Sequence, residues 1–411
     1  MKRSDDRILT THAGSLPRPG DLAAMLLEDH RTQDGAVRAR HERVTSATAE
    51  LVDTQITAGL DVVGDGEAGK PSYIGYVPDR LDGFGGQADD VAIGYMADYP
   101  EAAALVPMTS TGQRSTFALP ACIGPVSLRD PDAVHRDIRN LTAALAGCNY
   151  VEAFMTAASP GNVAMYMTNR YYRTEEEYLY AIADAMRYEY RAIVDAGFIL
   201  QIDCPDLSRR YDRSPDLPLA DVIHDTERNV EVLNHALADL PPDRMRIHIC
   251  WGNGEGPHHR DTELRHILVA VLRARPSGLL VEGANPRHAH EWKVFDDVDL
   301  PDGKLVIPGV VDTTNNYIEH PELVAQRIVA YASVVGRENV IAGTDCGFAT
   351  AVDYTRVLPR IAWAKLQSVV EGARLASKEL WGNHAIARVD RTADAGGEGS
   401  RPISLSARSS A

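Results

Sequence analysis

The chain has 411 residues, and 44% of them are hydrophobic, which is enough to bury the core of one large domain or two small ones. Its formal net charge of −16 argues against nucleic acid or an anionic membrane as the main partner. The five cysteines are widely spaced and do not resemble a disulfide framework, so we expect reduced thiols and a cytoplasmic protein. The N terminus leads into no apolar run, and we expect neither a signal peptide nor a membrane span.

The first predicted strand, at residues 7–11, leads into a loop at residues 12–19. Gly14 and the two prolines of this loop cannot continue a strand or a helix. The Ser15 hydroxyl and the backbone amides of the loop suit a carboxylate or another small polar group. A plain connection between a strand and a helix is an equally good interpretation of these residues alone.

A helix is predicted over residues 36–58, with Gly59 as its C-terminal cap. Residues 60–67 follow as a buried strand and a tight turn. Glu67 lies just past the strand end, where a carboxylate is most often a solvated turn residue. In a barrel, however, the carboxyl ends of the strands line the active site, so Glu67 is also a candidate for catalysis or substrate binding.

The rest of the chain continues the alternation after an irregular stretch. Residues 86–118 lack clear periodicity and are expected to form an insertion, and residues 386–411 are expected to form a disordered C-terminal tail. The clearest helix has a capping-box spacing at Thr174 and Glu177. The later predicted strands cover residues 119–126, 150–154, 198–203, 245–250, 278–282, 304–311 and 340–346. The later predicted helices cover residues 132–146, 174–196, 219–238, 261–274, 290–295, 321–335 and 352–381.

Strands that alternate with helices about eight times imply an α/β protein with a parallel sheet. At this length, the best interpretation is one (β/α)8 barrel, a TIM barrel, that covers residues 1–385 as the single catalytic domain. An open doubly wound sheet is the alternative. It is less favoured because no Gly-x-Gly-x-x-Gly fingerprint follows the first strand.

Residues that can bind a metal lie at the ends of three late strands. His248 and Cys250 are two residues apart in one strand, so their side chains point the same way. Glu282 and Cys346 end two later strands, and all strand ends of a barrel open at one face. Each residue alone has an ordinary explanation, such as a buried cysteine that acts as a small hydrophobe. Together they predict a tetrahedral Zn2+ site with two sulfur, one nitrogen and one oxygen ligand.

The ligand types indicate the chemistry of such a site. A thiolate-rich zinc site is less suited to activating water than a histidine-rich one. It suits a substrate thiol, which loses its proton on the metal and stays nucleophilic near neutral pH. If Glu282 can leave the metal, a position opens for that thiol. The predicted reaction is attack of a zinc-bound thiolate on an electrophilic carbon, which needs no redox cofactor.

The motifs around these ligands resemble the cobalamin-independent methionine synthase family. They are Ile247-His248-Ile249-Cys250-Trp251-Gly252-Asn253, Val281-Glu282-Gly283-Ala284-Asn285 and Gly343-Thr344-Asp345-Cys346-Gly347. Further similar motifs are Gly14-Ser15-Leu16-Pro17-Arg18, Gly66-Glu67, Leu81-Asp82-Gly83-Phe84, Gly124-Pro125-Val126 and Gln201-Ile202-Asp203. The resemblance covers about residues 7–382 and concerns the C-terminal catalytic barrel of the long enzymes, so the chain resembles a short, single-barrel form.

The resemblance implies a barrel of the type shared with uroporphyrinogen decarboxylase. The zinc ligands that it implies are His248, Cys250, Glu282 and Cys346. The residues that it implies for the amino-acid part of homocysteine are Gly14, Ser15, Glu67 and Asp203. Of these, Glu67 and Asp203 are the catalytic candidates, because their carboxylates would hold the amino group.

Three segments depart from the family pattern or lie outside it. The Asp-Glu-Pro after the fifth strand is Asp203-Cys204-Pro205 here, so a cysteine replaces a carboxylate. The Asp-x-His-Ser segment is Asp312-Thr313-Thr314, so the histidine linked to proton delivery is absent, and the nearby His320 is expected to begin a helix. Residues 169–172 are cationic and aromatic, and they suit either an anionic co-substrate or a structural loop.

The first functional hypothesis is a zinc-dependent transferase of the 5-methyltetrahydropteroyltriglutamate–homocysteine S-methyltransferase type. It would transfer a methyl group to a small thiol and give a thioether such as methionine. The alternative is a thiol alkyltransferase that resembles the epoxyalkane:coenzyme M transferases. A decarboxylase of the uroporphyrinogen type would not need the metal set, and a structural zinc site would cluster its cysteines in close pairs. The alkyl donor, the thiol and a homo-oligomeric state stay open.

Overall fold

The computed structural model describes residues 1–27, 34–89, 98–99, 101, 119–209, 217–352, 354 and 356–382. The predicted tail at residues 386–411 and most of the predicted insertion at residues 86–118 lie outside these residues. In the described part of the chain, no helix combines the length and the apolar character that crossing a bilayer requires.

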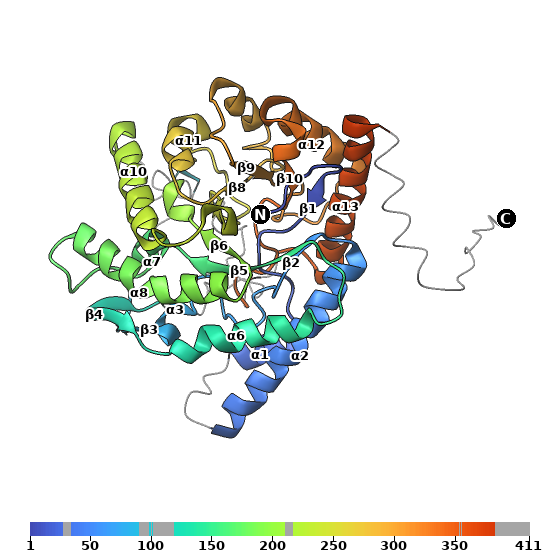
Figure 1. Cartoon of the computed structure of the whole chain (residues 1–411). Coiled ribbons are helices and arrows are strands. Elements are labelled where there is room, and N and C mark those ends of the chain that lie inside the picture. The colour runs from blue at the N-terminus through green and yellow to red at the C-terminus, as the bar shows by residue number, and fades with distance from the viewer. Residues whose placement is uncertain are drawn as a thin grey trace.

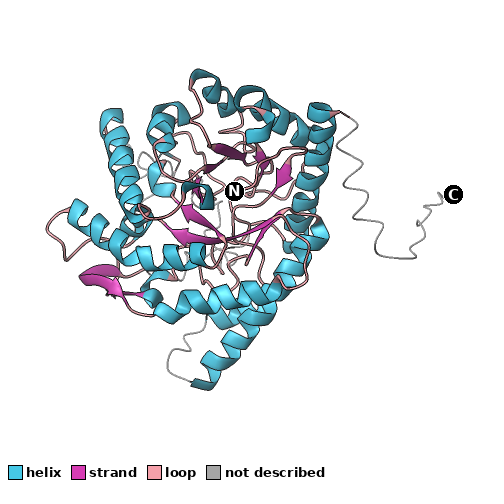
Figure 2. Ribbon diagram, in the orientation of Figure 1, coloured by secondary structure: helices cyan, strands magenta, loops and turns pink. Residues whose placement is uncertain are grey.

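The centre of the molecule is a barrel of short parallel strands (Figures 1 and 2). Six strands pair side by side in chain order, and the first strand pairs with the last. Parallel bridges from Val306 to Val340 and from Gly309 to Gly343 join these two groups on one side. On the other side, the Asp61 N–H donates to the Thr10 carbonyl over 3.2 Å. The barrel strands are β1 (Leu9–Thr10), β2 (Val62–Gly64), β5 (Glu152–Ala158), β6 (Ile199–Asp203), β7 (Met245–Ile249), β8 (Gly278–Val281), β9 (Leu305–Pro308) and β10 (Ile341–Ala342).

Helices surround the barrel, as the prediction of a (β/α)8 fold requires (Figure 1). The predicted cap of the clearest helix is confirmed, because the Thr174 hydroxyl accepts from the Glu177 N–H over 3.1 Å. The helices are α1 (Gly20–Leu27), α2 (Asp34–Ala58), α3 (Val77–Arg80), α6 (Pro131–Ala144), α7 (Pro160–Tyr166), α8 (Glu175–Asp195), α10 (Leu219–Ala236), α11 (Leu264–Leu272), α12 (Pro321–Val335) and α13 (Pro359–Trp381). Short 3-10 helices are η1 (Pro205–Leu207), η2 (Pro242–Arg244), η3 (Glu291–Asp297) and η4 (Arg337–Asn339).

One predicted strand lies outside the barrel. Residues 119–126 were expected among the alternating strands, but β4 (Ala121–Leu128) pairs antiparallel with β3 (Leu81–Gly85). Its side chains are partly exposed, with Ile123 at 55%, whereas the barrel strands are buried along nearly their whole length. An antiparallel pair can face water on one side, and the proline at position 125 suits an edge strand.

The interior of the barrel is polar at the level of Arg246 on β7. The Arg246 Nε donates to Gln201 Oε1 over 2.8 Å. Its two terminal nitrogens donate to the Thr11 hydroxyl over 3.1 Å and to the His12 carbonyl over 3.0 Å. The guanidinium carbon lies 3.9 Å from the centre of the Phe154 ring. Arg246 is 1% exposed and connects β5, β6 and the segment directly after β1. It therefore stabilises the barrel beside His248, which lies two residues later in β7.

Substitution of Arg246 by Met should lower the free energy of unfolding by about 3 kcal/mol, because three buried acceptors lose their donor. Chemical denaturation followed by circular dichroism measures this change. The matched control is Arg38→Met, since the Arg38 side chain is 83% exposed and forms one surface ion pair with Glu42. An equally small effect of both substitutions would contradict the role of Arg246.

Candidate metal centre

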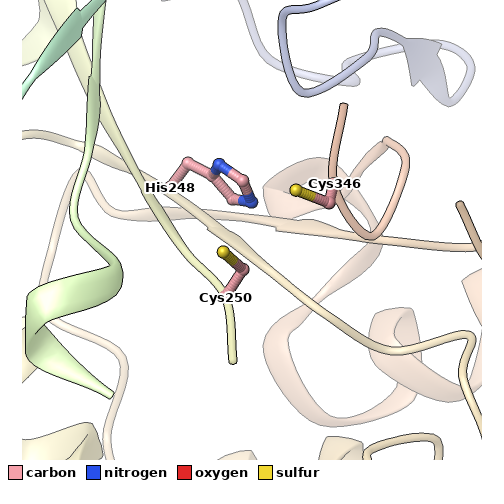
Figure 3. Close-up of side chains that lie close together, drawn as sticks. All are labelled: His248, Cys250 and Cys346. Carbon is pink, nitrogen blue, oxygen red and sulfur yellow. The ribbon is translucent and has the colours of Figure 1, made fainter. Parts of the chain in front are cut away.

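Three of the four predicted metal ligands meet at the carboxyl end of the barrel (Figure 3). His248 lies in β7, Cys250 follows the end of that strand, and Cys346 lies in the segment after β10. One ligand atom from each residue lies within 4.8 Å of the others, and all three residues are buried. The period-2 prediction for His248 and Cys250 therefore holds, and the barrel brings in a sulfur from a strand about 100 residues later.

The two sulfurs share a hydrogen bond, which shifts their pKa values in opposite directions. The hydrogen bond from Cys346 lowers the pKa of Cys250 to about 6, although burial opposes this change. The same hydrogen bond and burial raise the pKa of the Cys346 thiol well above its usual range. Two sulfurs and one imidazole nitrogen form a donor set that fits a tetrahedral transition metal, zinc above all.

Glu282, the fourth predicted ligand, lies beside this group but not within it. It follows β8 and is 5% exposed. Its Oε1 accepts from the Trp251 N–H over 2.8 Å, and its Oε2 accepts from the Asn285 side chain over 2.7 Å. Burial raises the pKa of Glu282 well above its usual range, while the charge of His288 lowers it and that of Cys250 raises it. Glu282 as a ligand therefore stays a prediction.

A hydrogen bond from the neighbouring strand orients His248. The β6–β7 register places Asp203 opposite His248, and Asp203 Oδ1 lies 3.2 Å from His248 Nδ1. The same oxygen accepts from the Gln201 side chain over 2.9 Å. Burial works against a charged His248, but the bond to Asp203 and the charge of Cys250 outweigh it and raise the His248 pKa to about 9. Because Nδ1 faces Asp203, Nε2 is the nitrogen that would bind a metal, for which it must exchange its 3.2 Å contact with the Asp345 carbonyl oxygen.

Asp345 connects the two loops that carry Glu282 and Cys346, a role that the sequence analysis did not assign. Its Oδ1 accepts from the Gly283 N–H over 2.9 Å, and its Oδ2 accepts from the Asn285 N–H over 2.8 Å. These bonds hold the loop after β8 against the residue that directly precedes Cys346. The sequence around Asp345 gives no signal for this contact, because its partners Gly283 and Asn285 lie about 60 residues earlier in the chain.

The predicted substrate loop lies against the metal group. Gly14 has φ +133°, and a Cβ at this position would come 2.7 Å from Glu67 Oε1. A Cβ on Gly347 would collide with the Ser15 hydroxyl oxygen. Since Gly347 follows Cys346, the loop of Gly14 and Ser15 packs between Glu67 and the metal ligands.

Glu67 is buried rather than a solvated turn residue, with 2% exposure and a backbone φ of +56°. Its Oε1 accepts from the Thr156 hydroxyl over 2.9 Å, and its Oε2 is buried without a hydrogen-bond partner. Burial raises the pKa of Glu67 to about 7; Lys70 lowers this pKa and the charge of Asp203 raises it. A strained, buried carboxylate with one open oxygen is typical of a ligand-binding position.

The two residues that depart from the family pattern, Cys204 and Thr313, have different surroundings. Cys204 is buried and donates to the Ile202 carbonyl over 3.5 Å, outside the metal group. The Thr313 hydroxyl donates to Asn253 over 2.8 Å, and Asn253 donates to the Gly347 carbonyl over 2.8 Å. Asn253 therefore links Thr313 to Gly347, the residue after Cys346. The sequence analysis did not predict this link.

Two other segments are structural. His320 caps α12 by accepting from the Glu322 N–H over 3.3 Å, as predicted for the start of a helix. Within residues 169–172, Asn169 forms a bridge to Cys122 in β4. The Tyr172 hydroxyl of the same segment accepts from the Val126 N–H over 2.8 Å. These contacts favour the structural interpretation of residues 169–172.

Comparison with known proteins supports the resemblance. No family model matches the chain. The chain is 25% identical over 377 residues to the methionine synthase of Saccharolobus solfataricus, which covers 90% of this chain and 95% of that protein. It is 23% identical over 375 residues to the methionine synthase of Sulfolobus acidocaldarius, which covers 90% of this chain and 93% of that protein.

The fold has relatives among solved structures. A B12-independent methionine synthase from Shewanella sp. W3-18-1 matches with a TM-score of 0.66 and 19% identity over 91% of this chain and 99% of that chain. A putative B12-independent methionine synthase from Listeria monocytogenes matches with a TM-score of 0.61 and 18% identity over 90% of this chain and 98% of that chain. The predicted fold and the resemblance to the cobalamin-independent methionine synthase family, in its short form, are confirmed.

Substitution of Cys346 by Ser should remove most of the bound transition metal, since one of three converging ligands is lost. Elemental mass spectrometry of the protein purified with zinc measures the metal content per chain. The matched control is Cys148→Ser, because Cys148 is half-buried and outside the metal group. Full metal content in the Cys346 variant would rule out this site.

Proposed function

We propose that this relative of the cobalamin-independent methionine synthases transfers a methyl group to the sulfur of a small amino-acid thiol. Homocysteine is the simplest such thiol, and methionine is then the product. The observation that carries the proposal is the placement of the His248, Cys250 and Cys346 group beside a loop that packs on a buried carboxylate. That carboxylate, Glu67, has one oxygen without a partner, which suits a ligand amine.

Zinc is the metal that the donor set favours, and His248, Cys250 and Cys346 would hold it. Glu282 would be the fourth ligand. To bind the metal, its carboxylate must give up its hydrogen bond from the Trp251 N–H or from the Asn285 amide. When bound, such a zinc ion lowers the pKa of an incoming thiol, so that the thiol loses its proton and its sulfur is nucleophilic near neutral pH.

The protein itself orients both the ligands and the substrate. Asp203 accepts from His248 Nδ1, which leaves Nε2 as the metal-binding nitrogen once it exchanges its contact with the Asp345 carbonyl. The charge of Asp203 also raises the pKa of Glu67, so the ionised Glu67 carboxylate is repelled by Asp203. An ammonium group placed between the two carboxylates would relieve this repulsion. The Ser15 hydroxyl would receive the carboxylate of the same substrate, and the Gly14 N–H would join it if it exchanged its hydrogen bond to His12 Nδ1.

In the transfer step, the sulfur forms a bond to the methyl carbon, the bond from that carbon to the donor breaks, and its electron pair stays on the donor. The proton of the thiol leaves when the thiol binds. Burial of Cys250, Cys346 and Glu67 excludes water, so the sulfur competes with no bulk nucleophile. A thiol with an anionic tail in place of an amine, as in the epoxide alternative, would face the two carboxylates Glu67 and Asp203, which argues against it.

The proposal is tested with the zinc-loaded protein and a panel of thiols and donors. Homocysteine, 4-mercaptobutyrate and 2-mercaptoethanesulfonate are each combined with a methylated folate, a methylated corrinoid and an epoxide. Mass spectrometry of the thioether measures the product. We expect product from homocysteine with a methyl donor. Product only from the sulfonate thiol and the epoxide would replace this proposal with the alternative, and no product from any pair would overturn it.

The preference for an amine-bearing thiol should depend on pH. The Glu67 carboxylate must be ionised to accept an ammonium group, and its pKa lies at about 7. The ratio of kcat/KM for homocysteine over 4-mercaptobutyrate should therefore be low below pH 7, rise as pH increases through 7, and level off above it. Taking the ratio cancels the ionisation of the two thiols.

The Glu67→Gln variant serves as the comparison for this profile, because it keeps the shape of the side chain but cannot ionise. We expect its ratio to be at least about 10-fold lower above pH 7 and flat with pH, as loss of one charged hydrogen bond implies. A pH-dependent ratio in this variant would show that another group controls amine recognition.

A further inference from the structure

We infer that Lys70 and Thr156 are positioning residues that fix Glu67 as a hydrogen-bond acceptor and thereby determine the preference for a thiol with an ammonium group. This inference rests on the proposed function. Neither residue contacts the metal group, and neither was a candidate from the sequence. They matter because they decide which oxygen of Glu67 is open and what that oxygen can bind.

Lys70 is a buried lysine with 4% exposure. Its ammonium donates to the Thr156 carbonyl over 2.7 Å and to the Thr156 hydroxyl oxygen over 2.9 Å. The ammonium nitrogen also lies 4.4 Å from the centre of the Tyr76 ring, whose other contacts include the Arg80 guanidinium at 4.6 Å. The Ala158 N–H donates to the Tyr76 hydroxyl over 2.9 Å, so the ring that packs on Lys70 is itself held in place.

The chemistry of these groups gives the hydrogen bonds one direction. An ammonium group can only donate, so the Thr156 hydroxyl must accept from Lys70. The hydroxyl has a single proton, which it donates to Glu67 Oε1 over 2.9 Å. Thr156 lies in β5, is 3% exposed and pairs with Gln201 of β6, so its backbone is fixed by the barrel. The chain from Lys70 to Glu67 therefore has no alternative orientation while Lys70 is charged.

This direction leaves Glu67 with one open oxygen. Oε1 receives the Thr156 proton and packs against Gly14, where an added Cβ would come within 2.7 Å. Oε2 is buried and has no partner. If Glu67 were protonated, the proton would lie on Oε2, and that oxygen would donate rather than accept. The charge of Lys70 favours the ionised form, which accepts an ammonium group.

An ionised Glu67 therefore selects a thiol by the positive charge of its amine. Oε2 of an ionised Glu67 stabilises a cationic N–H donor, whereas a thiol that lacks the amine leaves this oxygen buried and unsatisfied. Without Lys70, the Thr156 hydroxyl is free to turn away and Glu67 takes up a proton more readily. The preference for the amine would then fall even though the metal group and the sulfur position are unchanged.

The test measures thiol binding rather than turnover, so that it does not depend on the methyl donor. Isothermal titration calorimetry on the zinc-loaded protein compares homocysteine with 4-mercaptobutyrate in four variants. These are Lys70→Met, Thr156→Val, Thr156→Ser and the control Lys304→Met. Lys304 is a matched lysine, because its ammonium donates to main-chain carbonyls at the opposite end of the barrel strands.

We expect the unaltered protein to bind homocysteine more tightly than 4-mercaptobutyrate. Lys70→Met and Thr156→Val should reduce this preference at least about 10-fold with unchanged zinc content, as loss of a charged hydrogen bond predicts. Thr156→Ser keeps the hydroxyl and should keep the preference, as should Lys304→Met. If Lys70→Met does not fold, the Val and Ser variants at position 156 still decide the question.

The pH dependence of the preference for homocysteine is a second measurement. It would not change if Lys70 only stabilised the fold. The charged groups that influence Glu67 are Lys70, Asp203, Arg18 and Asp65. Removal of the Lys70 charge should shift the midpoint of the preference to higher pH, because that charge lowers the pKa of Glu67.

The outcomes separate this inference from the function on which it rests. A full preference in Thr156→Val, or an equal weakening of both thiols in Lys70→Met and Thr156→Val, overturns the inference while the proposed function stands. Failure of the unaltered protein to bind either thiol overturns the proposed function and the inference with it.

Discussion

The hydrogen bond between Asp203 and His248 is the interaction on which the site depends. It exists because the β6–β7 register places these two residues opposite each other. On one side it fixes the imidazole that faces Cys250 and Cys346. On the other side it places a carboxylate near Glu67, whose pKa responds to the charge of Asp203. One strand pairing therefore links the metal group to the predicted amine site, so a shift of one residue would separate them.

The site concentrates acidic groups in a buried space, and this arrangement has a direct chemical meaning. Cys250, Cys346, Glu282, Glu67 and Asp203 are all less than one tenth exposed. Burial raises the pKa of Glu67 and Glu282, which means that their charged forms are unfavourable without a cation nearby. In the proposed function, a divalent metal and a substrate ammonium would add to the charges of Lys70 and His288, which already lower the pKa values of Glu67 and Glu282.

Much of the fold and half of the site followed from local patterns. Buried strands that end in Gly, Pro or a polar residue, followed by helices, are sufficient to predict a parallel barrel. The period of two in a strand is sufficient to pair His248 with Cys250. The strand at 119–126 was misplaced because its pattern is the same whether it joins a parallel or an antiparallel partner. Its partner β3 lies about 40 residues earlier, and only packing selects it.

By itself, the sequence determined which residue types stand at the strand ends, because periodicity and turn residues are local properties. The tertiary structure decided how those residues are used. Glu282 bonds to Trp251 and Asn285 outside the three-residue metal group, and Asp345 ties the Glu282 loop to the Cys346 loop. Lys70 and Thr156, 86 residues apart, set the open oxygen of Glu67. Such contacts depend on strand register and loop packing, which bring together groups that no local pattern relates.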